Sequence, residues 1–329
     1  YTTLFRSLKQ EDMNMRISIA NIFTHLFLLL ALLATASCSD WTDQKTVDID
    51  PQHAKEQNPE LWARYMETLR TYRQSKHFVT YGSFDNSAEK SKNEGDYLRS
   101  LPDSLDIVTP THPESLTSYD CEDILLLQEK SIKVLYLVDY TAQMPALTDA
   151  AKLGAWLDKA VAAASQLGMN GFAIKGTPLY GGTEAEQAAR REAAKLIVSK
   201  LSTAVGDGKL LVFEGDPAFM DAADLNKLDY VVLNTATITS AVDLKLYVAG
   251  VIENFSIPKE KLLLSAKINE KLVDEEGEKL DAVTEMTNRV VSLGPVGGLA
   301  IYALGDDYYH TKMNYETSRL AIQIMNPSK

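Results

Sequence analysis

The chain has 329 residues, of which 45% are hydrophobic, and this is enough apolar material for a large buried core in one big domain or two smaller ones. Its 45 acidic side chains outnumber the 33 Lys and Arg residues, which gives a net charge of -12 at pH 7. This charge repels phosphates, and the basic pair Arg190-Arg191 is interleaved with Glu residues at helical spacing, which is typical of a solvated helix face. We therefore expect no nucleic-acid partner.

The first 38 residues have the pattern of a secretory signal. Arg16 precedes an apolar run over 26–34 (LFLLLALLA), and small residues then lead to Cys38. The run is too short to span a bilayer with ease. Cys38 stands where a bacterial lipoprotein signal, which this segment resembles, carries its lipidated cysteine. We expect a signal peptide over 1–38, with 1–12 upstream of the true start, and a protein anchored to the outer membrane of the cell envelope, facing either the periplasm or the outside.

Residues 39–60 are polar and acidic without sustained periodicity, so we interpret them as a flexible tether that ends where a folded domain over 61–329 begins. Cys121 is the one other cysteine, and with Cys38 lipidated it has no disulfide partner. The histidines show no metal-ligand spacing, and the sequence contains no nucleotide-binding loop. We therefore expect no metal and no cofactor.

Short β-rich runs, several of them almost wholly apolar, follow along the rest of the chain. They cover 77–84, 105–109, 132–138, 171–175, 209–214, 228–234, 261–268 and 296–303. Nearly continuous apolar runs are typical of parallel strands that are buried on both faces.

Amphipathic segments over 149–167, 184–205, 240–255 and 282–293 separate several of these runs. Asp149 is placed to cap the first of them, and Gly206-Asp-Gly208 stops the second. Eight strands that alternate with helices predict an α/β fold with a single (β/α)8 TIM barrel. An open doubly wound sheet is the alternative, but the turn after the first run lacks the glycine spacing of its phosphate loop.

The fourth run and its flanks read GMNGFAIKGTPLYGG over 168–182. Every second side chain of a strand faces the same way, so Ala173, Lys175 and Thr177 form one row that climbs toward the carboxyl end, where barrel active sites lie. This strand resembles the fourth strand of glycoside hydrolase family 18, the chitinases and endo-β-N-acetylglucosaminidases. The family pattern is Asp-Gly-x-Asp-x-Asp-x-Glu, and the corresponding acidic positions here are Asn170, Ala173, Lys175 and Thr177.

The resemblance implies a role for two of these positions. In the family the last acid protonates the leaving oxygen, and the Asp two residues earlier orients the substrate acetamido group, which attacks the anomeric carbon. A threonine hydroxyl at 177 is far too weak an acid, and Lys175 offers no acceptor to an amide N–H. Because the loss of general-acid assistance costs about 10²- to 10⁴-fold in rate, we expect the family's mechanism to be absent.

Two further runs support the resemblance. The stretch from Gly297 to Tyr302 is similar to the family's Gly-Gly-x-x-x-Trp. This implies that the Tyr302 ring forms the floor of the sugar-binding subsite. The sixth run retains Asn234 as the polar group suited to an acetamido contact. Tyrosines at or after the strand ends suit stacking on sugar faces. The predicted ligand-binding residues are Tyr81, Lys175, Thr177, Tyr180, Glu214, Asn234, Tyr302 and Asp306.

Glu214, at the end of the fifth run, is the best candidate for a substitute acid. Alternatively, Glu214 or Asp139 pairs with Lys175 and offsets the cost of placing an ammonium group in the barrel mouth.

Two functions follow from these residues and the resemblance. The first is a surface lipoprotein whose degenerate barrel captures N-acetylglucosamine-containing glycans of the N-glycan type beside glycan-uptake machinery, as in Bacteroidetes. The second is an endo-β-N-acetylglucosaminidase whose acid has moved to Glu214. A scaffold without a sugar ligand is the remaining alternative.

Overall fold

The computed structural model describes residues 54–144, 147, 149–292 and 296–327. The predicted signal peptide, its lipidated Cys38 and most of the predicted tether lie outside these residues. The chain divides into two compact units, Tyr1–Gln57 and Asn58–Lys329. The described part of the first unit is the short helix α2 (Ala54–Gln57), and all the other described elements belong to the second unit.

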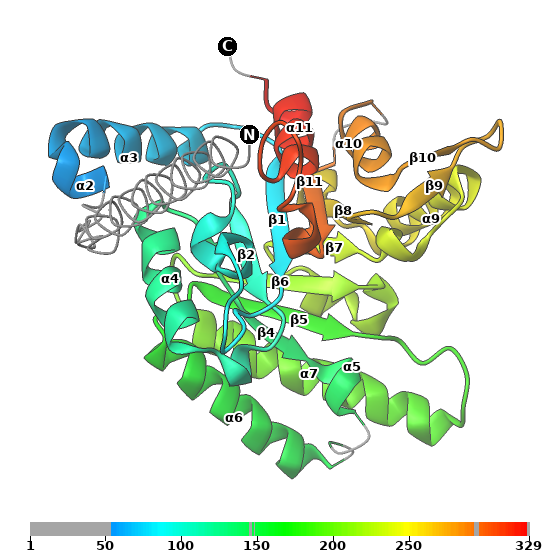
Figure 1. Cartoon of the computed structure of the whole chain (residues 1–329). Coiled ribbons are helices and arrows are strands. Elements are labelled where there is room, and N and C mark those ends of the chain that lie inside the picture. Colours follow the sequence, from blue (N-terminus) through cyan, green and yellow to red (C-terminus); the bar gives the residue numbers. More distant parts are fainter. Residues whose placement is uncertain (1–53, 145–146, 148, 293–295, 328–329) are drawn as a thin grey trace, which may run out of the picture. The chain divides into compact units, whose positions relative to one another are not determined.

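A sheet of nine parallel strands closes into a barrel in the second unit (Figure 1). The strand order is β3-β2-β1-β11-β8-β7-β6-β5-β4. A single residue, Leu135, separates β3 from β4, and these two strands pair with β2 and β5 respectively. They therefore act as two halves of one strand, so the nine strands fill the eight positions of the predicted (β/α)8 barrel.

Each predicted β-rich run contains a barrel strand, and the run over 132–138 contains two. The strands are β1 (Val79–Phe84), β2 (Ile107–Pro110), β3 (Lys133–Val134), β4 (Tyr136–Asp139), β5 (Gly171–Gly176), β6 (Leu210–Gly215), β7 (Tyr230–Leu233), β8 (Leu262–Lys267) and β11 (Gly298–Tyr302).

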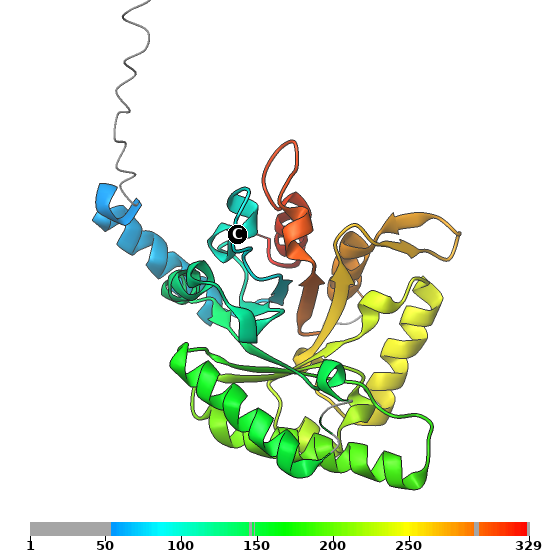
Figure 2. The ribbon, with the colours of Figure 1, turned by 60° about the horizontal axis from the view of Figure 1, so that its bottom comes forward.

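Helices lie on the outside of the barrel, as the green α6 and α7 and the yellow α9 do in Figure 2. The predicted helices are present as α6, α7, α9 and α10. The helices of this unit are α3 (Pro59–Gln74), α4 (Ser118–Glu129), α5 (Tyr140–Gln143), α6 (Ala150–Gln166), α7 (Glu184–Val205), α8 (Ala222–Leu225), α9 (Ala241–Phe255), α10 (Ala282–Ser292) and α11 (Glu316–Met325).

Local sequence signals set the ends of the two longest predicted helices. The Asp149 carboxylate accepts hydrogen bonds from the first backbone N–H groups of α6, as expected of an N-cap. At α7, Thr183 and Glu186 form a capping box in which each side chain accepts from the backbone of the other. Gly206 ends α7 with a φ of 62°, a conformation that favours glycine.

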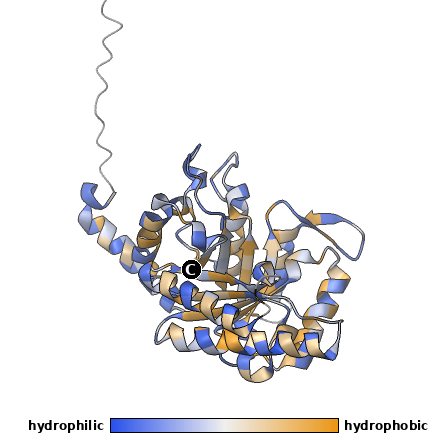
Figure 3. Ribbon diagram, turned by 90° about the horizontal axis from the view of Figure 1, so that it is seen from below, coloured by the Kyte–Doolittle hydropathy of each residue, from blue (hydrophilic) through white to orange (hydrophobic). Residues whose placement is uncertain are grey.

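The strands separate two apolar regions. Alternate side chains point into the barrel, where Tyr81, Ala173 and Val212 belong to a small interior cluster, while the others face the helices and form the large outer core. Figure 3, coloured by hydropathy, shows hydrophobic strands inside helices whose surfaces mix both kinds of residue. This alternation decides which side chains of each strand reach the barrel mouth.

Steric contacts explain why β5 and β11 each begin with a glycine. A Cβ atom on Gly171 would lie 1.9 Å from the backbone oxygen of Leu210, and one on Gly298 would lie 1.9 Å from that of Val79. Their φ angles of 137° and 158° also lie in the region that side chains disfavour. Glycine therefore allows the neighbouring strands to approach closely at these two points.

The helices α3, α4 and α11 and the β9–β10 hairpin (Lys271–Val273 and Lys279–Asp281) were not predicted from the sequence. Helix α4 shows the reason, because it buries Asp120 and Asp123 while Leu125 is exposed. Its sequence therefore lacks the continuous apolar stripe by which an amphipathic helix is predicted. Helix α3 starts at Pro59, two residues before the predicted start of the folded domain at residue 61. Within the described ranges, no helix is both long and apolar enough to cross a membrane.

Candidate ligand site in the barrel mouth

The predicted row on β5 is present at the carboxyl end of the barrel. Ala173 is fully buried in the interior cluster, while Lys175 and Thr177 are exposed above it. The next strand along the sheet, β6, places Glu214 beside Lys175 in the register of the two strands. The mouth is therefore built around these two charged side chains.

Glu214 is held by two tyrosines from distant strands. The Tyr81 hydroxyl donates a hydrogen bond to its Oε1, and the Tyr302 hydroxyl donates to its Oε2 over 3.1 Å. The carboxyl group is almost fully buried. The hydroxyl hydrogen of Tyr81 is used in the hydrogen bond to Glu214. The Thr109 hydroxyl, 2.5 Å away, therefore donates to the Tyr81 oxygen. Side chains from β1, β2, β6 and β11 thus form one hydrogen-bond network inside the barrel.

Burial dominates the electrostatics of this network. It raises the pKa of the Glu214 carboxyl above its ordinary value, although the Tyr81 hydrogen bond, the Lys175 charge and the Tyr302 hydrogen bond each act in the opposite direction. Burial and the Glu214 charge raise the pKa values of Tyr81 and Tyr302 well above those of free tyrosine. Both phenols therefore remain protonated hydrogen-bond donors at neutral pH.

Lys175 pairs with Asp139 and not with Glu214. The distance from its Nζ to Asp139 Oδ2 is 3.5 Å, and half of the lysine side chain is exposed. The second carboxylate oxygen of Asp139 accepts a hydrogen bond from the Ala142 N–H and so caps α5. Of the two pairings expected from the sequence, the structure contains the one that leaves Glu214 to the tyrosines.

The loop after β5 carries two more of the predicted residues. The Thr177 hydroxyl lies 3.1 Å from that of Thr141, and its backbone oxygen accepts a hydrogen bond from Arg190 over 2.7 Å. The Tyr180 hydroxyl donates to Asp216, although 73% of the tyrosine is exposed. Partial burial and this hydrogen bond raise the pKa of Tyr180 to about 12. An exposed ring with a fixed hydroxyl is a ready surface for sugar stacking.

Asn234, Asp306 and Asn170 occupy three different places. Asn234 is exposed just after β7, and its amide has no hydrogen-bond partner among the described residues. Asp306 lines a separate hollow of about 250 Å³ between the loops after β1 and β11, together with Asp85 and Tyr309. Asn170 precedes β5, at the opposite end of the barrel, where its Oδ1 accepts from the Val134 N–H. Asn170 is thus part of the barrel's amino end and not of its mouth.

The sequence analysis missed Thr109 and Asp216. Each stands at or just after the end of a strand, which is the positional signal for residues of a barrel mouth. Throughout the described ranges, no group of three or more His, Cys, Asp or Glu side chains is arranged to hold a metal ion.

The geometry of the mouth can hold a ligand more readily than it can donate a proton. Both Glu214 oxygens already accept hydrogen bonds, so a proton can reach a substrate only after a tyrosine hydroxyl has been displaced. Thr177, which the sequence resemblance predicts at the position of the family's acid, offers only a hydroxyl. The exposed Tyr180 ring, Asn234 amide and Lys175 ammonium group are suited to binding a polar ligand.

Comparison with known proteins identifies the family. The model of glycoside hydrolase family 18, BT1044-like, matches residues 42–152 and 149–324. The chain belongs to this family. A search of curated proteins finds no match.

Solved structures of family 18 proteins share the fold. A variant of BT1044 is 17% identical with a TM-score of 0.67, and the match covers 83% of this chain and 95% of that one. The apo endo-β-N-acetylglucosaminidase from Cordyceps militaris is 19% identical with a TM-score of 0.61, covering 80% of this chain and 95% of that one. At these identities the likeness establishes the barrel and not the activity.

Two similar structures hold glycan ligands. A double mutant of the Cordyceps militaris enzyme is in complex with fucosyl-N-acetylglucosamine-Asn, at 19% identity, a TM-score of 0.60, and coverage of 80% of this chain and 95% of that one. A mutant chitinase catalytic domain from Ostrinia furnacalis holds an N-acetylglucosamine oligomer, at 13% identity, a TM-score of 0.58, and coverage of 77% and 97%.

Proposed function

We propose that this family 18 protein captures N-acetylglucosamine-containing glycans in its barrel mouth and does not cleave them. The observation that carries the proposal is the state of the mouth carboxyl groups. Glu214 is buried under two tyrosine hydroxyls and Asp139 is paired with Lys175, while the resemblance predicts the family's acid at position 177, where this chain has Thr. A barrel mouth of this kind lacks a proton donor that is free to reach a glycosidic oxygen.

The groups that remain available are those that bind sugars. The exposed Tyr180 ring offers a face for stacking, and the unpartnered Asn234 amide offers both a donor and an acceptor to an acetamido group. The Tyr302 hydroxyl donates to the buried Glu214 carboxyl, and its ring is half-buried against the interior cluster. The glycans in complex with similar barrels support an N-acetylglucosamine-containing ligand of the N-glycan type.

The proposal is tested by measuring binding and cleavage on the same sample. The chain beginning at residue 39 is incubated with high-mannose and complex N-glycoproteins, released oligosaccharide is sought by mass spectrometry, and binding of the free glycans is measured by calorimetry. We expect binding without release, and we expect Tyr302→Ala to weaken it. Tyr65→Ala, which removes an exposed ring on α3, is the matched control and should bind as the unaltered protein does.

The raised pKa of Glu214 favours a second candidate, an endo-β-N-acetylglucosaminidase with a relocated acid. A carboxyl group whose pKa is raised by burial is shifted in the direction that a general acid needs. This function requires that ligand binding displaces Tyr81 or Tyr302 from the carboxyl group. Release of oligosaccharide by the unaltered protein, lost in Glu214→Gln, would support the enzyme and contradict the capture proposal.

We also propose that the protein is a lipoprotein of the outer membrane, anchored through Cys38 and working beside glycan-uptake machinery. The support is the order of a basic start, a short apolar run, small residues and cysteine in the sequence. Metabolic labelling with an alkyne fatty acid in a Gram-negative host should label the protein, and Cys38→Ala should abolish the label. An unlabelled protein would contradict the anchor.

A further inference from the structure

A cavity of about 450 Å³ lies at the amino ends of the barrel strands, at the end opposite to the mouth. Its apolar wall comes from residues that begin four strands, Val79, Ile107, Leu210 and Tyr230. The last turn of α3 and the end of α4 complete the enclosure. The volume falls within the range of about 300–1,000 Å³ that is typical of small-molecule sites.

The polar part of the lining is predominantly cationic, in a protein whose net charge is -12. Arg70, Arg73 and Lys133 face one carboxylate, Asp106, and a histidine, His77. Arg70 is paired with Glu67 at 2.7 Å outside the cavity. The balance of the site therefore depends on how Asp106 and the two remaining cations are partnered.

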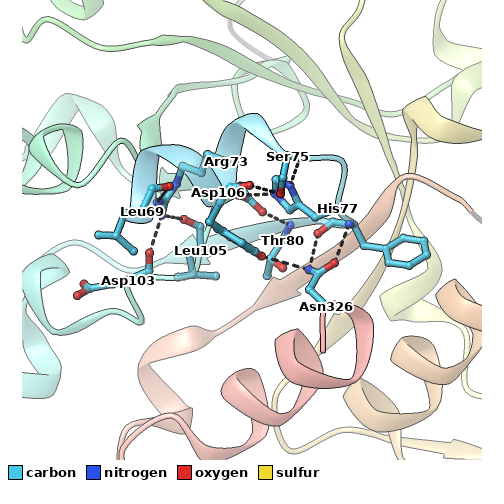
Figure 4. A network of polar contacts seen from close by, with 11 residues as sticks. Leu69, Arg73, Ser75, His77, Thr80, Asp103, Leu105, Asp106 and Asn326 are labelled. Carbon is cyan, nitrogen blue, oxygen red and sulfur yellow. Dashed lines mark hydrogen bonds and ion pairs between the residues drawn. The ribbon is translucent and has the colours of Figure 1, made fainter. Parts of the chain in front are cut away.

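Asp106 is fully engaged within the protein (Figure 4). Its Oδ1 is 2.9 Å from His77 Nε2, and its Oδ2 accepts from the Thr80 N–H over 2.8 Å. The hydrogen bond to Asp106 raises the pKa of His77, which favours the imidazolium form. Both oxygens of Asp106 thus have partners within the protein, and neither accepts a hydrogen bond from Arg73 or Lys133.

Arg73 has no carboxylate partner within ion-pair distance among the described residues. Figure 4 shows its guanidinium donating to backbone oxygens instead, those of Asp103 at 2.5 Å and Leu105 at 2.6 Å. Its Nε is buried without a hydrogen-bond partner. A guanidinium is charged at all physiological pH values, so it leaves a positive field beside the cavity.

Three donors of the lining are also unused by the rest of the described chain. The Lys133 ammonium and the Tyr230 hydroxyl make no hydrogen bond or ion pair with a described residue. Asn170 accepts through Oδ1 from Val134 N–H and Gln128, which fixes the amide so that its NH₂ group is the free end. The lining therefore combines an apolar wall with three donor groups, an ammonium, a phenol and an amide NH₂, that have no acceptor among the described residues.

We propose that this cavity binds a small organic anion, a carboxylate or phosphate group on a compact sugar-sized body. The oxyanion supplies the acceptors that Lys133, Tyr230 and Asn170 lack, in the field of Arg73, and the body of the ligand covers the apolar wall. The site is independent of the glycan-binding mouth, because it shares no residue with it.

The test is calorimetry on the purified full chain with inorganic phosphate, glucose 6-phosphate, gluconate and neutral glucose as probes. We expect one anion per chain to bind and glucose not to bind, with the tighter of glucose 6-phosphate and gluconate identifying the charged group. Lys133→Gln and Tyr230→Phe should each weaken binding by about tenfold, which corresponds to about 1.4 kcal/mol. Neither polar group has a hydrogen-bond or ion-pair partner in the described part of the chain, and Tyr230→Phe keeps the ring, so both variants should fold.

Lys245→Gln, which removes an exposed lysine on α9, is the matched control and should leave anion binding unchanged. The proposal is overturned by an absence of binding for all the anions, by equal binding of glucose, or by a loss in Lys245→Gln as large as that in Lys133→Gln. The last result would show attraction of anions to the surface as a whole.

Discussion

The charged side chains at the two ends of the barrel differ in how they are partnered. In the mouth, Lys175 pairs with Asp139, and the buried Glu214 is satisfied by two phenols. At the amino end, Arg73 donates only to backbone oxygens, and Lys133 has no partner among the described residues. A mouth whose charges are internally matched suits a neutral ligand such as a glycan, whereas unmatched cations suit an anion.

The largest effect should come from breaking the buried His77–Asp106 pair at the amino end. Asp106→Ala removes the acceptor of His77 and of the Thr80 N–H in a buried setting, so we expect a loss of about 3 kcal/mol in the free energy of unfolding. Urea denaturation measures it. The control Asp158→Ala breaks the exposed pair with Lys200 and should cost less than about 1 kcal/mol. Equal losses would contradict the described burial of Asp106.

A smaller loss is expected in the mouth. Tyr81→Phe removes a hydrogen bond to the buried Glu214 carboxyl, which should lower the free energy of unfolding by about 2 kcal/mol. Tyr136→Phe is the control, because that hydroxyl has no hydrogen-bond partner among the described residues, and it should cost less than about 0.5 kcal/mol. If Tyr81→Phe left the free energy of unfolding unchanged, the hydrogen-bond network around Glu214 would not form.

The pH dependence of stability should report the buried carboxyl group. The folded-state pKa of Glu214 lies above its unfolded value of about 4.3, so its contribution is fully present below that pH and is lost as the pH rises through the folded pKa. The stability of the unaltered protein should therefore fall relative to Glu214→Gln as the pH is raised from 4 toward 7. A rise of the unaltered protein over this range would show that Glu214 is stabilised as the anion.

The smallest effect is a gain of activity. Thr177→Glu combined with Lys175→Asp restores the two acids of the family 18 strand, and we expect slow release of oligosaccharide from N-glycoproteins, above the background of the unaltered protein. Mass spectrometry of the released glycan provides the measurement. A folded double variant that binds glycan and shows no release would contradict the assignment of position 177 to the acid.

The eight strand positions and the row of Ala173, Lys175 and Thr177 could be predicted because they depend on local patterns, the apolar runs and the alternation of strand side chains. The partners of Glu214 could not be predicted. Tyr81 is 133 positions away in the sequence, and only closure of the barrel brings β1 and β6 to the same interior.

The cavity at the amino end was missed for a similar reason. Asn170 is the first of the four motif positions, but it precedes β5 and lies at the amino end of the barrel, where it lines the cavity. Lys133 and Tyr230 come from different strands and share no local pattern. Part of the lining, Arg70, Arg73 and Gln74, also comes from α3, a helix that was not predicted from the sequence.

Titration of a purified high-mannose N-glycan into the protein, followed by mass spectrometry of an N-glycoprotein incubated with the same sample, tests the central claim most directly. Saturable binding, reduced in Tyr302→Ala, with the glycoprotein intact after prolonged incubation, is the result that capture without cleavage predicts. Oligosaccharide released in step with incubation time, and abolished by Glu214→Gln, would contradict it.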